Sequence, residues 1–402
     1  MTHTERLFWA DPTLTRFHAT LVASLEHQGR PAAVLSATCY YPTSGGQPHD
    51  TGTLGGLRVV EVIEEDERIL HITERPLRAA VGEAVDGEID WERRFDHMQQ
   101  HSGQHILSAA FLEVLGAGTV SFHLGAESST IDLDRPEVSE AEAARAEETA
   151  NAVVFADRPM LAREYDEAEV AALPLRKAPA VHGRIRVVSV EGFDASACGG
   201  THVTSTGQVG LIHIRRVERR RGQVRVEFLT GVRALRDYRS RDALVQGLAG
   251  GLSVGMSDLP EAVARIEEAE RAARQTLEAA LKELLTYRVA EMAASAERLA
   301  NGWRVVCRVL EGMDAAAMRL AANTLIAEPG LVAILAVTEP APQVVLARSA
   351  DVELGMGALL REVLAADGGR GGGAAHLAQG GAVRAEDLPA ILAEARRRLL
   401  AE

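Results

Sequence analysis

Short apolar runs alternate with polar residues and turn-forming residues over the first ninety positions of the chain. Residues 32–37 and 59–63 are strand-like, and glycine and proline separate them. Further strand-like runs occupy residues 119–123, 184–190, 209–217 and 224–229. The order predicts a small N-terminal β domain followed by a mixed core.

Helical spacing of apolar positions predicts three helices between the β domain and the last hundred residues. In the first, Asp96 and Gln99 have the spacing of a helix N-cap with its capping-box partner, and Gly116 ends the pattern. Residues 139–155 begin with Ser139 and carry acids in the first turn. Residues 258–300 carry a seam that packs on a neighbour or a symmetry mate: Leu259, Val263, Ile266, Ala273, Leu277, Ala280, Leu284 and Tyr287.

The last hundred residues have the pattern of a small α/β domain. Strand-like runs lie at residues 305–310, 331–337 and 344–348, with a helical run at residues 315–326. Residues 368–373, Gly-Gly-Arg-Gly-Gly-Gly, follow and predict a loop that presents backbone amides to a phosphate or to another chain.

Composition and cysteine usage favour an intracellular globular protein. The 402 residues are 47% hydrophobic and 25% charged, which is ordinary for globular domains. The N-terminus lacks the apolar run of a signal peptide, and no run of eighteen apolar residues occurs, so we expect a cytoplasmic protein without a membrane partner. Three scattered cysteines exclude a disulfide framework and leave thiolates free for metal.

The net charge of −14 argues against a polyanionic partner, but the charge is unevenly distributed. Residues 214–241 hold ten arginines against three acids. Arg215, Arg216, Arg219 and Arg220 are the candidates in this stretch for binding phosphate. A solvated arginine-rich hairpin and helix is the competing interpretation.

Two half-motifs together suggest a metal site. His101 and His105 are four residues apart, so they share one face of the first predicted helix. Cys198 and His202 flank a glycine-rich stretch and supply a soft and a borderline ligand, which with the two histidines makes a plausible zinc set. Buried or solvated histidines are the alternative. His97 also stands four residues before His101, so spacing alone leaves open which two helical histidines bind.

The set raises a question about what the metal does. Four protein ligands usually mark a structural zinc, because catalytic zinc keeps one position open. The glutamate base of a His-Glu-x-x-His motif is also missing, since Ser102, Gly103 and Gln104 stand between the histidines.

A loop in the N-terminal domain is a further candidate for ligand contact. Gly45 and Gly46 let a backbone approach a ligand closely, and Gln47 can orient water or a hydroxyl group. An ordinary turn explains the same three residues.

Four segments in order resemble the alanyl-tRNA editing proteins of the AlaX type in their long form, which are related to the editing domain of alanyl-tRNA synthetases. They are SGGQ at 44–47, HSGQH at 101–105, CGGTH at 198–202, and GGRGGG with AQGG near the C-terminus. The resemblance covers nearly the whole chain. One position departs from the synthetase pattern, because Gln104 stands where the synthetases have threonine.

The resemblance implies an α+β protein in four parts. These are an N-terminal β-barrel at residues 1–90, an editing core at 91–245, a spacer helix at 246–300, and a C-terminal glycine-rich α/β domain at 301–402. The last would serve tRNA binding or homodimer formation.

The implied activity is trans-editing, because ninety residues before the core leave no room for an aminoacylation domain. One Zn²⁺ per chain, held by His101, His105, Cys198 and His202, would support hydrolysis of tRNA(Ala) mischarged with serine or glycine. We expect Gln104, Gln47 or Ser121 to contact the serine side chain. The alternatives are a non-catalytic RNA-binding protein with structural zinc, and a zinc hydrolase of a small ester or amide.

Overall fold

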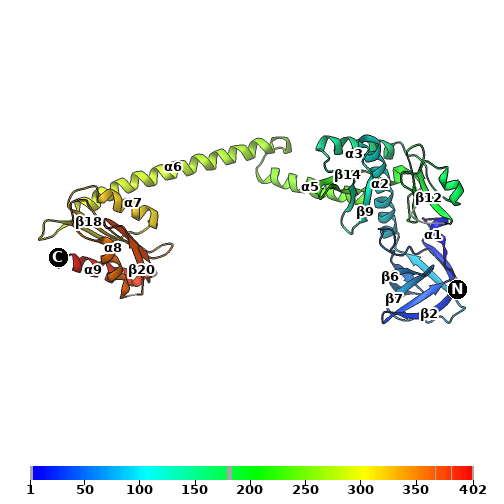
Figure 1. The fold of residues 1–402 in the computed structure, drawn as a ribbon, viewed down its shortest axis with the longest axis horizontal. Helices are drawn as coiled ribbons and strands as arrows, with labels where there is room; N and C mark the ends of the chain where they lie inside the picture. The colour runs from blue at the N-terminus through cyan, green and yellow to red at the C-terminus, as the bar shows by residue number, and fades with distance from the viewer. Residues whose placement is uncertain (1–2, 179–182, 367, 382, 401–402) are drawn as a thin grey trace. The chain divides into compact units, whose positions relative to one another are not determined.

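The computed structural model describes residues 3–178, 183–366, 368–381 and 383–400, and these form two compact units. Unit 1 is Met1–Gly251 and unit 2 is Leu252–Glu402. Both combine helices with sheets (Figure 1), so the predicted α+β class is confirmed. The first unit ends at Gly251, the last residue of helix α5 (Gly231–Gly251). The predicted spacer at residues 246–300 thus begins inside α5, and from Leu252 onward it lies in the same unit as the predicted C-terminal domain.

The N-terminal strands close into a six-stranded barrel, because β8 pairs with both β2 and β5. Aromatic residues that include Phe8, Phe17 and Tyr40 fill its core. Strands β1 (Glu5–Arg6) and β4 (Ala37–Thr38) pair beside it and flank the short helix α1 (Leu7–Ala10). The barrel strands in spatial order are β2 (Arg16–His27), β3 (Arg30–Leu35), β7 (Arg68–Thr73), β6 (Leu57–Glu65), β5 (Gly52–Leu54) and β8 (Ala84–Ile89).

Helix α2 (Trp91–Leu115) is the central element of the rest of unit 1. It ends at Gly116 in the left-handed conformation, as predicted. Its predicted start at Asp96 is wrong, because the helix begins directly after the barrel with Asp90 as N-cap. Asp96 lies inside the helix and pairs with Arg233, while the Gln99 amide donates to the Gln208 carbonyl.

Two sheets pack around α2. The first has the order β14-β15-β10-β9 and the second the order β11-β12-β13. Helix α3 (Glu140–Phe155) covers the core with the predicted capping box between Ser139 and Glu142, and α4 (Glu167–Ala171) is short. The strands are β9 (Thr119–Leu124), β10 (Ser129–Leu133), β11 (Met160–Tyr165), β12 (Ile185–Val190), β13 (Asp194–Ala197), β14 (Ile212–Arg220) and β15 (Gln223–Thr230).

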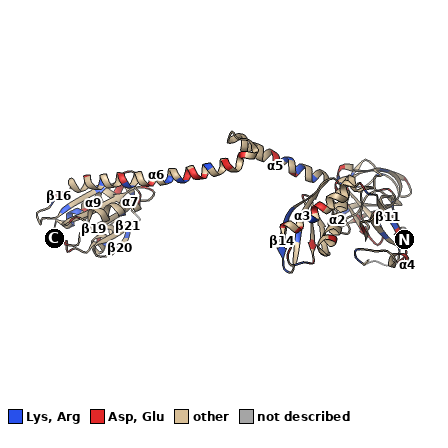
Figure 2. Cartoon of the chain, turned by 90° about the horizontal axis from the view of Figure 1, so that it is seen from above, with Lys and Arg blue, Asp and Glu red and all other residues tan. Residues whose placement is uncertain are grey.

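Unit 2 begins with the long helix α6 (Leu259–Ala294), which ends six residues before the predicted limit. Acidic and basic residues alternate along its ribbon (Figure 2). Much of the predicted seam is exposed, with Leu277 at 59% and Leu284 at 46%. Burial is instead concentrated near the end of the helix, where Leu285, Val289 and Met292 pack against the following domain.

The remainder of unit 2 is one six-stranded sheet with helices α7 (Ala315–Leu325), α8 (Met356–Ala365) and α9 (Leu388–Leu399). The predicted glycine-rich loop is wrong, because Arg370–Gly373 is the edge strand β20. Helix α8 contacts β20 closely, and glycine permits this approach. The strands in order are β16 (Glu297–Arg298), β17 (Arg304–Val309), β18 (Leu331–Val337), β19 (Gln343–Arg348), β21 (Leu377–Gly381) and β20.

Among the described residues, no helix has both the length and the apolar character needed to cross a bilayer.

The buried His71 should make the barrel sensitive to acid. Its ring is bonded to the Ala33 carbonyl and the Thr38 hydroxyl, and burial lowers its pKa to about 4. The unfolded chain therefore takes up a proton as the pH falls below about 6.5 while the folded chain does not. We expect a stability loss of about 2 kcal/mol by pH 5. Urea midpoints at pH 7.5 and 5.0 should differ less in His71→Gln than in wild type, and an equal difference in the two proteins would contradict this role of His71.

Candidate metal centre

Four predicted ligands converge in unit 1. His101 and His105 come from one face of α2, while Cys198 and His202 come from the loop after β13. Their nearest ligand atoms all lie within 4.8 Å of one another. The Cys198 Sγ is 3.4 Å from His101 Nε2 and 3.3 Å from His202 Nε2.

The third helical histidine is not part of this group. His97 lies one turn before His101 on α2, but its side chain lines a different cavity from the one beside the four ligands. The ambiguity in the sequence is thus resolved by geometry, because the ligand loop approaches α2 at His101 and His105.

The loop between Cys198 and His202 reaches the helix because of Gly200. A Cβ atom at Gly200 would lie 2.2 Å from His101 Cε1, so a side chain at this position would displace the ring. The Arg186 guanidinium secures the loop by donating to the carbonyls of Cys198 and Gly200, at 2.9 Å each. These contacts hold the thiol beside the imidazoles.

At His101 and His202 a polar partner at Nδ1 turns Nε2 toward Cys198, while Nδ1 of His105 has a carboxylate at ion-pair distance but no hydrogen bond within the described part of the chain. Gln47 Oε1 is 2.8 Å from Nδ1 of His101, and Ser102 Oγ is 3.2 Å from that of His202. Asp194 Oδ2 lies 3.5 Å from Nδ1 of His105. Such outer partners set the tautomer and orientation of metal-binding histidines.

The electrostatics favour a thiolate at Cys198. Burial opposes ionisation, but His101 and His202 outweigh it and hold the pKa of the Cys198 thiol well below its usual range. Burial, together with His101, holds the pKa of His202 well below its ordinary value. For His105, burial is opposed by Asp194 and Cys198, and the net effect raises its pKa. A thiolate with neutral imidazole at His202 is a state able to bind metal.

The donor set fits zinc. A tetrahedral site with bonds of ~2.3 Å to sulfur and ~2.0 Å to nitrogen places those atoms about 3.5 Å apart. The two sulfur–nitrogen distances given above agree with this spacing. Four ligands of this kind are typical of a tetrahedral Zn²⁺ site.

A cavity of about 860 Å³ opens beside the four residues. His101, His105 and Cys198 line it, together with Gly45 and Gly46 of the N-terminal loop. Gly46 adopts a left-handed conformation, and a Cβ atom there would lie 2.8 Å from the Phe122 ring. The loop can therefore pack on Phe122 only with glycine at this position.

The three residues predicted to contact a substrate hydroxyl differ in whether a side-chain donor or acceptor is left without a partner in the protein. Gln104 and Ser121 line the cavity. The Gln104 amide nitrogen donates to Ser108 Oγ, but its buried Oε1 has no partner. Ser121 donates to Asp132.

Gln47 has a different position from the one its motif suggested. Its side chain is fully buried, and both ends of the amide are bonded within the protein. Oε1 accepts from the Thr201 amide and faces His101, and Nε2 donates to Thr201 Oγ1. It therefore orients a candidate ligand.

Removing the Gln47 amide should weaken metal binding. Replacing outer partners of metal-binding histidines typically costs 10–100-fold in metal affinity, so Gln47→Ala should lower zinc affinity by about that factor. Competition with a chromogenic chelator measures the change. Gln246→Ala, at an exposed glutamine of α5, is the matched control and should bind zinc like the wild type. Unchanged affinity in Gln47→Ala would contradict the orienting role.

The predicted phosphate-binding arginines do not line this cavity. Arg215, Arg216, Arg219 and Arg220 lie on β14, part of whose ribbon is coloured as basic residues (Figure 2). Each has an acidic neighbour within ion-pair distance: Glu227 and Asp237 for Arg215, Glu218 for Arg216 and Arg220, and Glu137 for Arg219. Local acids thus offset much of the positive charge counted in the sequence.

The sequence interpretation missed the outer partners Asp194, Ser102 and Arg186. Asp194 is nearly inaccessible and also pairs with Arg176, whose guanidinium donates to the His105 carbonyl. Ser102 stands inside the histidine motif, so the motif itself contained one available signal. Nothing in the spacing marks Asp194 or Arg186.

Two family models match the chain. The "Threonyl and Alanyl tRNA synthetase second additional domain" matches residues 185–227, which include the Cys198 loop. The DHHA1 domain matches residues 302–401, within unit 2.

Curated relatives match over longer stretches. The alanyl-tRNA editing protein AlaX-L of Pyrococcus horikoshii is 31% identical over 389 residues, covering 94% of each chain. The alanyl-tRNA editing protein Aarsd1 of Mus musculus is 37% identical over 242 residues, covering 59% of this chain and 58% of that protein. An alanine–tRNA ligase of Pyrococcus furiosus is 34% identical over 83% of this chain but only 37% of the ligase.

Proposed function

The chain belongs to the AlaX family of alanyl-tRNA editing proteins. From this premise we propose that it acts in trans, with one Zn²⁺ per chain, to hydrolyse the ester bond that joins a wrong amino acid to tRNA(Ala). The proposed substrate is the serine ester, with the glycine ester as a second substrate. The observation that carries the proposal is the set of one half-buried cysteine and three buried histidines beside a cavity.

The reaction is the addition of water to the ester carbonyl carbon, followed by cleavage of its bond to the ribose oxygen. Free amino acid and tRNA with an intact hydroxyl result. Zinc, when bound, would supply positive charge that polarises the carbonyl and acidifies water. Gln47, Ser102 and Asp194 hold the three imidazoles in place, and the Arg186 contacts fix the ligand loop.

Editing is needed because the enzyme that charges tRNA(Ala) must distinguish alanine from serine. A pocket for alanine cannot strongly exclude a serine, which adds only a hydroxyl group. A second site with an unsatisfied buried acceptor favours the substrate that brings a donor. Gln104 Oε1 is such an acceptor at the cavity wall, so we assign it the contact with the serine hydroxyl.

The assignment predicts a specific loss in Gln104→Leu. The variant keeps an extended side chain but no acceptor, so serine release should slow by about tenfold or more, the value of one hydrogen bond to a buried group. The ratio of serine to alanine release from tRNA(Ala) is the measurement. Ser121→Ala is the matched control, because the Ser121 hydroxyl already donates to Asp132. Equal selectivity of Gln104→Leu and wild type would refute the assignment.

The arginines of β14 are proposed to contact the tRNA backbone. Side chains of Arg216, Arg219 and Arg220 are 66%, 70% and 52% exposed. Exposed ion pairs contribute only ~0–1 kcal/mol, so phosphates can compete with their acidic partners. For unit 2 we propose tRNA binding or homodimer formation, to which the exposed apolar residues of α6 would contribute.

The activity is tested by deacylation of tRNA(Ala) carrying serine, glycine or alanine. We expect release of serine with alanine retained; glycine release would extend the activity to an ester that lacks the hydroxyl. Binding of tRNA without release of any amino acid would instead support a non-catalytic RNA-binding protein with structural zinc. Hydrolysis of small esters without competition from tRNA would support a small-ester hydrolase.

A further inference from the structure

A second cavity of about 580 Å³ lies in unit 1 next to the first. It is bounded by Pro48, the start of α2, the turn after β9 and the start of α5. Two segments line both cavities. The loop after β4 supplies Gly46 to the metal cavity and Pro48 to the second cavity. Strand β9 supplies Phe122 to the metal cavity, and the turn after it supplies Gly125 to the second. The Leu124 amide donates to the Gly46 carbonyl and joins these segments.

The second cavity contains a flat aromatic surface. Trp91 and Phe95 are stacked, with ring centroids 5.4 Å apart and planes inclined by 27°. Both rings line the cavity, and Trp91 remains 38% exposed. An exposed aromatic ring is the platform on which unpaired nucleobases stack.

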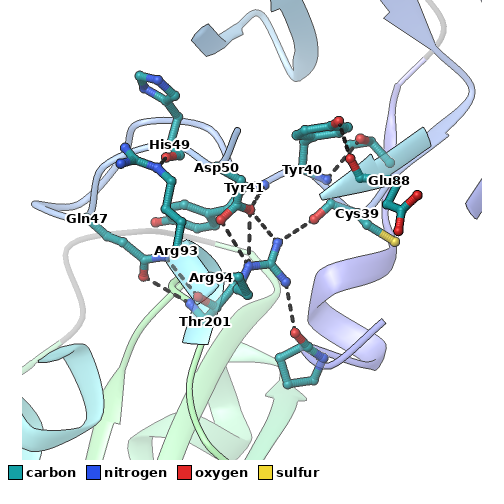
Figure 3. A network of polar contacts seen from close by, with 12 residues as sticks. Cys39, Tyr40, Tyr41, Gln47, His49, Asp50, Glu88, Arg93, Arg94 and Thr201 are labelled. Carbon is teal, nitrogen blue, oxygen red and sulfur yellow. Dashed lines mark hydrogen bonds and ion pairs between the residues drawn. The ribbon is translucent and has the colours of Figure 1, made fainter. Parts of the chain in front are cut away.

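Two arginines beside the rings carry charge available to a ligand. Arg93 donates to the His49 carbonyl (Figure 3), and Arg236 lies exposed on α5. Neither has a carboxylate within ion-pair distance in the part of the chain that the structure describes. Two acids line the cavity with three arginines. Arg233 binds Asp96 through two nitrogens, and Glu92 has neither Arg93 nor Arg236 within ion-pair distance.

A buried polar atom in the wall lacks a partner. His97 is 4% exposed, and its Nδ1 has no hydrogen-bond partner. Unpaired buried polar atoms are uncommon in folded proteins. Because the ring lines the cavity, a ligand with donors or acceptors along a planar edge can supply the missing bond.

We propose that this second cavity binds an unpaired nucleotide of the tRNA acceptor strand, adjacent to the nucleotide whose ester enters the metal cavity. The base stacks on Trp91, its edge meets His97, and Arg93 and Arg236 contact the phosphate. An apolar peptide would use the rings but leave both arginines without an anion. The inference deepens the proposed function and rests on it.

The test compares full-length variants on two substrates. Trp91→Ala should lower kcat/KM on Ser-tRNA(Ala) by about 5- to 150-fold, the usual range for losing one stacked base. Seryl-adenosine ester, which carries no neighbouring nucleotide, should not show this loss. Trp91→Phe keeps an aromatic ring and should restore most of the tRNA activity. Phe155→Ala, at a 75% exposed ring outside the cavity, is the matched control.

Binding of uncharged tRNA(Ala) separates this inference from the proposed function, because it needs no hydrolysis. Arg236→Gln should reduce the salt dependence of tRNA affinity by about one phosphate contact, whereas Arg239→Gln on the same helix should not. If Trp91→Ala binds tRNA more weakly but the wild type releases no amino acid, the second cavity is a nucleotide site and the proposed deacylase activity is wrong. Equal tRNA binding by Trp91→Ala and Phe155→Ala, or equal losses on both esters, would overturn the inference.

Discussion

Replacing Cys198 by alanine is expected to abolish zinc binding and deacylation together. Cys198 supplies the only sulfur of the four-residue set, and its thiol is held toward the ionised form by His101 and His202. Changes to outer partners alone cost about 10–100-fold in metal affinity, so loss of a ligand should exceed ~100-fold. Zinc content by atomic absorption and serine release from Ser-tRNA(Ala) are the two measurements.

The control for this variant is Cys307→Ala in unit 2, at a cysteine outside the four-residue set. It should retain zinc and activity. Circular dichroism establishes whether Cys198→Ala is folded, since a structural zinc would make folding itself depend on the metal. A folded Cys198→Ala protein that still holds one zinc per chain would refute the ligand assignment.

Replacing Arg94 by methionine is expected to destabilise unit 1 by about 3–5 kcal/mol, the usual result of leaving a buried charge unpaired. Arg94 and Asp50 are both fully buried and form a salt bridge (Figure 3). The guanidinium also donates to the carbonyls of Pro12 and Cys39, and Asp50 accepts from the Tyr41 amide. This network joins α2 to the barrel and, through Tyr41 and Asp50, to the two ends of the loop that carries Gln47.

Urea denaturation of the full chain measures the change as a shift in midpoint. Arg58→Met is the control, because the Arg58–Asp90 pair is 46% and 37% exposed. Such a pair contributes ~0–1 kcal/mol. The double variant Asp50→Leu/Arg94→Met should recover part of the stability, because neither charge is then left without its partner. An Arg94→Met variant as stable as Arg58→Met would contradict the role of the network.

Hydrophobic periodicity predicted several strands and the helices α2, α3, α6 and α7, because burial of one face sets that pattern locally. It did not identify strand β2 or helices α8 and α9. Ser139 and Glu142 form the predicted capping box, and Gly116 ends α2 as expected. The start of α2 could not be predicted in this way. Asp96 resembles an N-cap in sequence, yet the barrel determines where the chain enters the helix, and Arg233 occupies the Asp96 carboxylate.

Spacing marked Cys198, His202 and three helical histidines as candidate ligands, and only the fold separates His101 and His105 from His97. The groups that orient the ligands could not be predicted from spacing, since Asp194 and Gln47 approach the histidines only after folding. Gln47 shows the limit most clearly. Its motif suggested substrate contact, but burial and the bonds to Thr201 give it a supporting role.

The numbers of arginines and glycines in a segment were less informative, because the role of these residues depends on their neighbours in the folded protein. The arginines of β14 face acids from β14, β15, α5 and the Glu137 region, which a local count cannot register. The glycines at 371–373 likewise suit either a loop or a closely packed strand. Pairing with β21 decides between the two.

The central claim is that one zinc held by His101, His105, Cys198 and His202 makes this chain a deacylase selective for serine. The most direct measurement is stepwise addition of Zn²⁺ to the metal-free protein, with serine and alanine release from tRNA(Ala) followed at each step. Serine release should rise to a plateau at one zinc per chain while alanine remains esterified. Serine release at full rate without metal, or equal release of both amino acids at the plateau, would contradict this claim.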